Sequence, residues 1–300
     1  MRVHEFLQLY EVGYRNFKGI NLSGADLSGC ILVDVDLSEA NLVATNLSRA
    51  FLTKGQFVGA QLQRANLQFA KLSETNFRHA NLTKLHGEGA FWIKSDLSQA
   101  TLSGARLAHV NLRQSCLRGA NVAGATLSGV NLRETQLQES NFAWSNLYGA
   151  RLYGANITAM KCNGVNLEAA RLNGLNFNGC DLNGVNFAHA HMKGINLQGA
   201  NLTAANLSYA QLQHANLQQT QLAGANLGHA KMQRANLGGA NLLRANFEQT
   251  DLSGAVLFDT LLSDPLGTNF QSAQRPVPLP VQTVSAPRLS MGLFSSLTVR

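Results

Sequence analysis

"GANLGHAKMQRANLGGANLL", residues 224–243, states one five-residue phrase four times. The phrase is close to Ala-Asn-Leu followed by two variable positions. When its Leu is called position i, the phrase recurs at every residue number ending in 2 or 7, from Phe17 to Leu262. These 50 phrases never slip out of frame. Because repeat proteins grow as one body, the repeat overrides the two-domain expectation for a chain of 300 residues.

Each position of the phrase has its own chemistry. Position i is Leu in 36 phrases and Phe in 7. The other seven centres are Gly87, Trp92, Val122, Ile157, Cys162, Met192 and Met232, of which only Gly87 is not apolar. Position i−2 is usually Ala, and position i−1 is usually Asn or Asp. Each phrase therefore offers one small and one large apolar side chain, two residues apart.

A period of five suits neither regular secondary structure. On an α-helix, each step of five turns the side chain by ~140°, so the leucines would spiral around the helix. On a straight strand, an odd step places successive leucines on opposite faces. A short extended segment followed by a corner keeps every Leu inside. Repeated corners of one hand wind the chain into a coil whose turns stack ~4.8 Å apart.

The phrases "ANLSRA", "GADLSG", "RANLQFA" and "GANLGG" resemble the A(D/N)LXX motif of the pentapeptide repeat family. The resemblance covers residues 15–263. It implies an all-β solenoid, a right-handed quadrilateral β-helix with four phrases per coil and about twelve coils. At ~4.8 Å per coil, the rod would be roughly 60 Å long. The opening "EFLQLYEVGYRNFKGINLSGADLSG" resembles those of bacterial, especially cyanobacterial, members.

The two ends of the chain differ from the repeat. Val3, Phe6, Leu7 and Tyr10 have amphipathic helical spacing, and Gly13 follows as a stop. We therefore expect residues 1–14 to form a helix that caps the exposed edge of the first coil. All five prolines follow Leu262, so residues 264–300 are predicted to be a disordered tail. The β-helix itself is expected to span residues 15–263.

The composition favours a polar, weakly charged surface. Charged residues make up only 14% of the chain, yet its net charge is +7. No stretch is long and apolar enough for a membrane span, and two glutamates interrupt the first apolar run, which argues against a secretory signal. The expected location is the cytoplasm. The four scattered cysteines form no CxxC pair, and we interpret them as core residues or spare thiols.

No motif in the sequence indicates an enzyme, a cofactor site or a metal site. There is no GxSxG, HExxH or P-loop motif. His109, His189 and His229 share one column, but gaps of ~19 and ~10 Å between them are too long for a shared ion. His189 and His191 are close together and are interpreted as a solvated pair. We therefore predict a protein without catalytic, cofactor-binding or metal-binding residues.

Charge is concentrated on one face of the predicted rod. The phrases centred on residues 32, 52 and every twentieth residue up to 252 carry four acidic residues, for a net charge of +6. Their ten basic residues are Lys54, Lys71, Lys94, Arg113, Arg133, Arg151, Arg171, Lys193, Lys231 and Arg234. The remaining faces have net charges of +2, −1 and −2. Uneven surface charge can also arise by chance on a solenoid, and this alternative stays open.

Five of the basic residues form the candidate binding site, which we call the basic strip: Arg113, Arg133, Arg151, Arg171 and Lys193. Arg113 and Arg133 are predicted to share one column, and Arg151 and Arg171 another. Like charges one coil apart repel, and among these residues only Arg133 has an acidic residue nearby, Glu134, that can offset its charge. An anionic partner would relieve the others, with an affinity that falls as salt rises.

The preferred hypothesis is a non-enzymatic interaction protein that presents flat faces to an acidic protein surface. The first alternative is binding of nucleic acid or an anionic membrane surface by the basic face, with Phe91 and Tyr153 as the aromatic candidates for base stacking. A second alternative follows from the resemblance alone, since some members of the family mimic DNA and bind type II topoisomerases. Those mimics are acidic, so the basic face argues against that role.

One irregularity is expected inside the rod. The stretch "LHGEGAFWI", residues 85–93, puts Gly87 at a centre and Leu85 at a position that is usually Ala. A missing Leu costs roughly 2–5 kcal/mol unless Trp92 or Leu85 fills the space. We therefore predict a bulge or a short extruded loop here, with Trp92 mostly buried.

Overall fold

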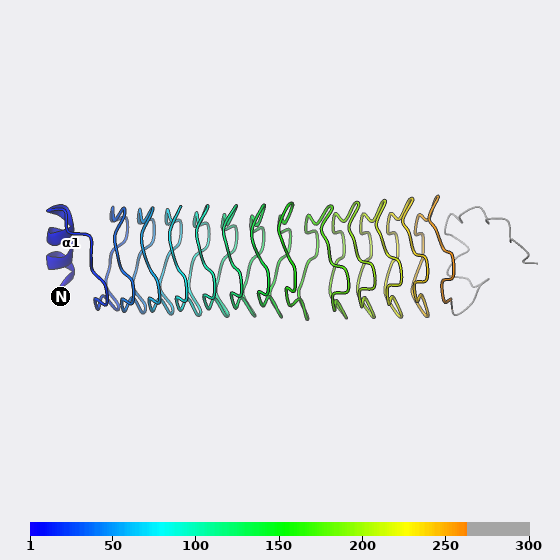
Figure 1. The fold of residues 1–300 in the computed structure, drawn as a ribbon, viewed down its shortest axis with the longest axis horizontal. Coiled ribbons are helices and arrows are strands. Elements are labelled where there is room, and N and C mark those ends of the chain that lie inside the picture. Colours follow the sequence, from blue (N-terminus) through cyan, green and yellow to red (C-terminus); the bar gives the residue numbers. More distant parts are fainter. Residues whose placement is uncertain (263–300) are drawn as a thin grey trace, which may run out of the picture.

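The computed structural model describes residues 1–262 of the chain. These residues form a rod of stacked coils with one helix, α1, at its N-terminal end (Figure 1). The predicted tail, residues 264–300, lies outside the described residues. The rod places each phrase at a fixed position along its length and around its circumference.

Four phrases complete one coil. Position i−1 of each phrase pairs in parallel with the residue 20 positions further on, from Asn16 with Asp36 to Asn241 with Leu261. Leu22 N donates to Asn41 O at 2.8 Å, and Gly24 N donates to Val43 O at 2.8 Å. Each phrase thus contributes a single pairing residue, and its inter-coil hydrogen bonds run along the rod. Corresponding phrases of successive coils therefore form one face.

Each phrase turns a corner after its centre. Position i+2 adopts left-handed backbone angles, with φ of 68° at Gly24 and 56° at Ala44. The amide at i+3 then donates to the carbonyl of the centre, as Ala25 N does to Leu22 O at 3.1 Å. Because Gly tolerates this backbone without steric cost, it is frequent at i+2. The corner turns the chain so that the next Leu again faces inward.

The centres and the i−2 side chains fill the interior of the rod. Leu27, Leu32 and Leu37 are completely buried, and so are Ala40 and Ala50. Polar side chains at i−1 connect the coils on the outside. Asn131 Nδ2 donates to Asn111 Oδ1 at 3.1 Å, while the Asn111 carboxamide accepts a hydrogen bond from the Arg113 amide at 3.2 Å. One Asn therefore stabilises both its own corner and the stack of coils.

Helix α1, Val3–Glu11, lies against the first coil. Phe6 is fully buried, and its ring meets that of Phe17 edge-on at 4.6 Å between centroids. Tyr10 Oη donates to Val33 O at 2.9 Å. Gly13 follows with φ of 97°. These contacts bring the apolar face of α1 onto the end of the core.

The prediction of a bulge at residues 85–93 is wrong. His86 pairs with Arg106 and Phe91 with Asn111 in the regular pattern, and Gly87 N donates to Arg106 O at 2.8 Å. A Cβ atom at Gly87 would lie 3.0 Å from Leu107 and 3.1 Å from Leu85, so these two side chains already occupy the space. Trp92 is fully buried, as predicted, and lies within 3.5 Å of the same point.

The irregular coil lies elsewhere, between residues 153–165 and 173–186. Among the described residues, the pairs of Asn156 with Asn176 and of Lys161 with Asp181 are missing from an otherwise continuous parallel series. Pairing is intact at Arg151 with Arg171 and resumes at Asn166 with Asn186. The step between successive coils is visibly wider in this green part of the rod (Figure 1).

Unusual side chains occupy the interior next to this break. Met160 is the only Met at an i−2 position, and Leu175 fills another i−2 position that usually holds Ala. Cys162 is the only Cys at a centre. We attribute the break to overfilled corners beside an underfilled centre, because excess volume in a packed core displaces the backbone.

Candidate macromolecule-binding face

The pairing register fixes the position of the basic strip. Since the regular spacing of 20 residues holds through Gly87, the strip residues share one face with the earlier basic residues of that face. All five strip side chains are exposed. Arg151 and Arg171 are a direct pair on neighbouring coils. The 20-residue register alone thus places these cations on one face of the rod.

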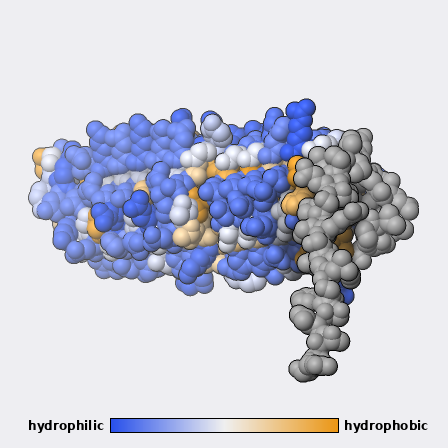
Figure 2. All heavy atoms as spheres, turned by 45° about the vertical axis from the view of Figure 1, so that its right-hand side comes forward, coloured by the Kyte–Doolittle hydropathy of each residue, from blue (hydrophilic) through white to orange (hydrophobic). Residues whose placement is uncertain are grey.

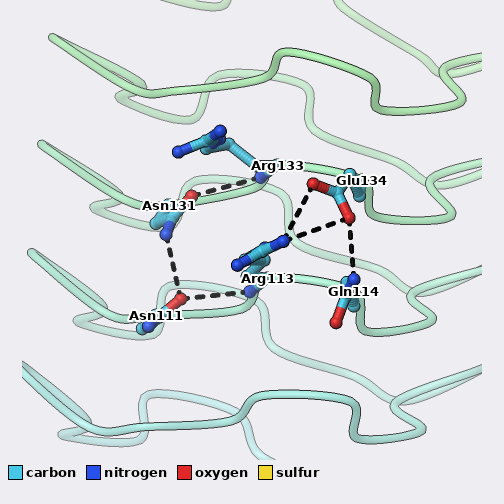
Figure 3. Close-up of polar contacts among 6 residues, drawn as sticks. All are labelled: Asn111, Arg113, Gln114, Asn131, Arg133 and Glu134. Carbon is cyan, nitrogen blue, oxygen red and sulfur yellow. Dashed lines mark hydrogen bonds and ion pairs between the residues drawn. The ribbon is translucent and has the colours of Figure 1, made fainter.

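Arg113 is the strip residue with an ion-pair partner (Figure 3). One of its terminal guanidinium nitrogens lies 3.1 Å from Glu134 Oε1. Gln114 Nε2 donates to Glu134 Oε2 at 2.7 Å. Hydrogen bonding from Gln114, followed by the charge and hydrogen bond of Arg113, lowers the pKa of the Glu134 carboxyl. This carboxylate therefore connects two coils.

The prediction that Glu134 offsets the positive charge of Arg133 is wrong, because the carboxylate contacts two other residues. Glu134 reaches back to the preceding coil, so its oxygens are bound by Arg113 and Gln114 (Figure 3). The Arg133 charge contributes only a minor part of the lowered pKa of Glu134. Figure 3 shows the Arg133 guanidinium extending away from the carboxylate.

The other four cations of the strip are less compensated. Within residues 1–262, neither Arg133 nor Arg151 has an acidic oxygen within 4.0 Å, and the same holds for Arg171 and Lys193. Arg151 and Arg171 occupy equivalent positions on adjacent coils, a separation of ~4.8 Å between backbones. Such a pair repels by about half to one kcal/mol when exposed. An anionic partner would offset this repulsion.

The two aromatic candidates on this face differ in their surroundings. Phe91 is 37% exposed, and Lys71 Nζ lies 3.7 Å above its ring centroid in a cation–π contact. Tyr153 is 61% exposed and lines the break between the coils. Of these two candidates, Tyr153 therefore presents the more open ring beside the basic strip.

Another face carries an aromatic stack that the sequence analysis missed. The Tyr209 ring lies between those of His189 and His229, at centroid distances of 4.8 and 4.5 Å and nearly parallel to both. The signal in the sequence was the column at position i+2, in which Tyr209 separates the two histidines that were considered. Within residues 1–262, no group of three or more His, Cys, Asp or Glu side chains is placed to hold a metal ion.

The four cysteines are buried or partly buried. Burial, together with a smaller contribution from Cys180, raises the pKa of the Cys162 thiol to about 12. Burial also raises the pKa values of Cys30 and Cys180. Cys116 is partly exposed, with its Sγ 3.1 Å from Ser98 Oγ. All four are free thiols.

Comparison of the sequence with protein families gives one match. The profile named "Pentapeptide repeats" matches eight copies. The matched residues are 16–54, 57–85, 88–119, 115–152, 150–187, 180–219 and 220–257. No curated protein matches the chain. In the part of the chain that the structure describes, no helix is long and apolar enough to cross a membrane.

Several solved structures resemble the chain, all with low TM-scores. HetL, a pentapeptide repeat protein involved in heterocyst differentiation regulation from Nostoc sp. strain PCC 7120, is 28% identical, with 91% of this chain and 94% of HetL covered and a TM-score of 0.30. The plasmid-mediated fluoroquinolone resistance protein QnrB1 is 17% identical, with coverages of 71% and 91% and a TM-score of 0.32. A pentapeptide repeat protein from the Arabidopsis thaliana thylakoid lumen is 24% identical, with coverages of 43% and 68% and a TM-score of 0.18.

Proposed function

Since the chain belongs to the pentapeptide repeat family, we propose that it is a non-enzymatic interaction protein whose basic strip binds an acidic protein surface. The observation that carries this proposal is the set of four exposed cations without acidic partners among residues 1–262. They lie on one face, at a spacing fixed by the coils. A rigid row of positive charge favours a partner with a matching row of carboxylates.

The finer architecture is part of the same proposal. We propose a right-handed winding with about twelve coils, and the pairing at every twentieth residue supports the number of coils. Helix α1 would act as a cap, since it covers Phe17 at the first coil with Phe6. The division into a cap (1–14), a β-helix (15–263) and a tail (264–300) follows the repeat boundaries.

Binding of nucleic acid or of an anionic membrane surface is the second candidate. The exposed ring of Tyr153 beside Arg151 and Arg171 favours it, because bases stack on open aromatic rings. A single open ring offers little surface for base stacking, however, whereas binding of an acidic protein requires no aromatic ring. A DNA mimic that binds topoisomerase is disfavoured, since the face with the largest excess charge is basic.

Capture from cells at two salt concentrations tests the proposal. The full chain is immobilised, and a nuclease-treated, detergent-cleared extract is applied at low and then moderate salt. The expected result is one or a few acidic proteins that are retained at low salt and released as salt rises. Retention that is seen only with an extract that has not been treated with nuclease would instead favour nucleic acid. Binding to vesicles with anionic lipid, without any retained protein, would favour the membrane.

A further inference from the structure

The break in the stack of coils leaves a crevice in the rod. Its volume is about 450 Å³, and its lining includes Tyr153, Asn156, Ile157, Asn173, Leu175 and Asn176. The interior side chains Ile157 and Leu175 remain almost fully buried, whereas the two Asn side chains at position i−1 are exposed. On the side drawn in Figure 2, apolar atoms show between the polar side chains near the middle of the rod.

The break leaves backbone groups without their regular partners, and two of these residues, Ile157 and Asn176, line the crevice. In regular coils, the amide of each centre donates to the carbonyl 19 residues further on, as Leu137 N does to Asn156 O at 2.8 Å. Among the described residues, the amides of Ile157 and Cys162 make no such bond. The amides on the opposite wall, at Asn176 and Asp181, also lack their regular acceptors.

In each phrase of the break, the two coils thus leave donors and acceptors free, and a left-handed corner at Ala159 or Gly179 separates one phrase from the next. One direct link between the walls is a side-chain contact of 3.3 Å from Asn163 Nδ2 to Asp181 Oδ2. Unpaired strand edges bind another extended polypeptide through its main chain. A nucleic acid backbone has no comparable combination of donors and acceptors. The chemistry of the walls therefore favours a peptide.

Charge at the mouth of the crevice specifies which peptide. Arg151 and Arg171 are the last intact pair before the break, with Leu152 N donating to Arg171 O at 3.1 Å. Both side chains are exposed and lack ion pairs in residues 1–262. Tyr153, two residues along, offers an apolar ring at the rim. Carboxylates of a bound peptide would lie next to this pair of arginines.

We propose that the crevice binds an extended acidic peptide segment, which pairs with the free backbone groups and places its carboxylates against Arg151 and Arg171. This inference rests on the proposed function, because it specifies how the acidic partner engages the strip. The crevice would add sequence-tolerant main-chain bonds to the charge attraction. Partner choice would then depend on an extended conformation as well as on charge.

Amide hydrogen exchange on the full chain tests the crevice itself. In the free protein, the amides of Ile157, Cys162, Asn176 and Asp181 should exchange at least tenfold faster than the equivalent amides one coil away, such as Leu137. A peptide of about ten residues with alternating Asp and Thr should slow their exchange. The same peptide with Lys in place of Asp should not. Slow exchange of these four amides in the free chain would overturn the proposal.

Variants separate the crevice from the strip. Arg151→Gln with Arg171→Gln should weaken binding of the Asp-Thr peptide at least tenfold. The matched control pair outside the basic strip, Arg49→Gln with Arg64→Gln, should change binding less than threefold. Met160→Ala with Leu175→Ala restores the usual small corner residues. It should close the crevice, slow the exchange of the Ile157 and Cys162 amides and abolish peptide binding.

The outcomes distinguish this inference from the proposed function. If the crevice closes but the Asp-Thr peptide and the cellular partner still bind, the crevice inference is wrong and the strip proposal stands. If Met160→Ala with Leu175→Ala abolishes binding of the Asp-Thr peptide, the crevice is a peptide site. If capture of cellular proteins at the same time does not depend on the strip, the proposed function is wrong. Equal binding of the Asp and Lys peptides would contradict the role of the two arginines.

Discussion

Each position of the phrase meets a different physical demand. The centre must fill the interior, position i−1 must bond its own corner, and position i+2 must tolerate a left-handed backbone. Non-Gly residues accept that backbone at Ala44 and Arg234, at a cost of about 1 kcal/mol each. The repeat tolerates such local costs because every coil adds buried leucines, each contributing roughly 1.5–3 kcal/mol.

At position 87, Leu would match the repeat pattern, but the space around Gly87 does not accommodate it. Gly87→Leu restores the usual centre, yet even a Cβ atom there would crowd Leu107 and Leu85. We expect it to lower the free energy of unfolding by about 1–3 kcal/mol, measured by denaturant titration. The control Leu107→Ala should cost about 2–5 kcal/mol. A stabilised Gly87→Leu protein would show that the space is empty.

The Cys162 thiol gives a pH dependence with a definite sign. Its pKa is about 12 in the folded chain, against 9.0 for an ordinary thiol, so unfolding above pH 9 releases a proton. The stabilisation is complete below pH 9 and is lost as pH rises towards 12. Between pH 8 and 10, the wild type should lose about 1.4 kcal/mol more unfolding free energy than Cys162→Ala. Equal losses in the two proteins would mean that the thiol is accessible.

At the scale of elements, helix α1 packs against the first coil of the repeat. Phe6→Ala removes a buried ring from the contact with Phe17 and should cost about 3–5 kcal/mol in local stability. Loss of the helix would leave the first coil with unpaired backbone groups, which promote self-association. Light scattering should then show a mass that rises with concentration. The control Leu9→Ala changes a side chain that is 39% exposed, and its mass should not change with concentration.

The elements also show what sequence reasoning could and could not reach. The fixed frame of five predicts corners and an inward Leu, while the family resemblance implies four phrases per coil. The bulge at Gly87 was a wrong prediction because Leu85, Leu107 and Trp92 fill the space from three directions, and the reach of Leu107 from the next coil depends on side-chain rotamers. The break was missed because Ile157 and Cys162 keep the centres apolar. The available signal was Met160 at a small-residue position.

At the scale of the whole rod, register connects distant residues. Because the spacing of 20 residues continues through Gly87, the basic face could be assembled from the sequence alone. The ion pairs could not, since Glu134 reaches across a coil to Arg113. Side-chain reach of this kind depends on rotamers. The sequence therefore identifies the face, whereas the structure identifies which of its charges lack a partner.

The strip should contribute nothing to the stability of the rod. Changing Arg113, Arg133, Arg151, Arg171 and Lys193 to Gln removes repulsion between column neighbours and one exposed ion pair. Such a pair is worth about 0–1 kcal/mol, so these effects nearly cancel. We expect an unfolding free energy equal to or slightly above that of the wild type at low salt. A decrease of more than about 1 kcal/mol would indicate a structural role.

Loss of the partner from this five-residue variant is the most direct test of the central claim. Its matched control changes five basic residues outside the strip to Gln: Arg49, Arg64, Lys84, Arg118 and Lys161. Both variants have the same net charge, so they differ only in where the charge was removed. At low salt, the strip variant should retain none of the acidic proteins that the wild type captures, and the control should retain them all. If the strip variant keeps every protein recovered by the wild type, the strip is ordinary solvated surface and the proposed function is wrong.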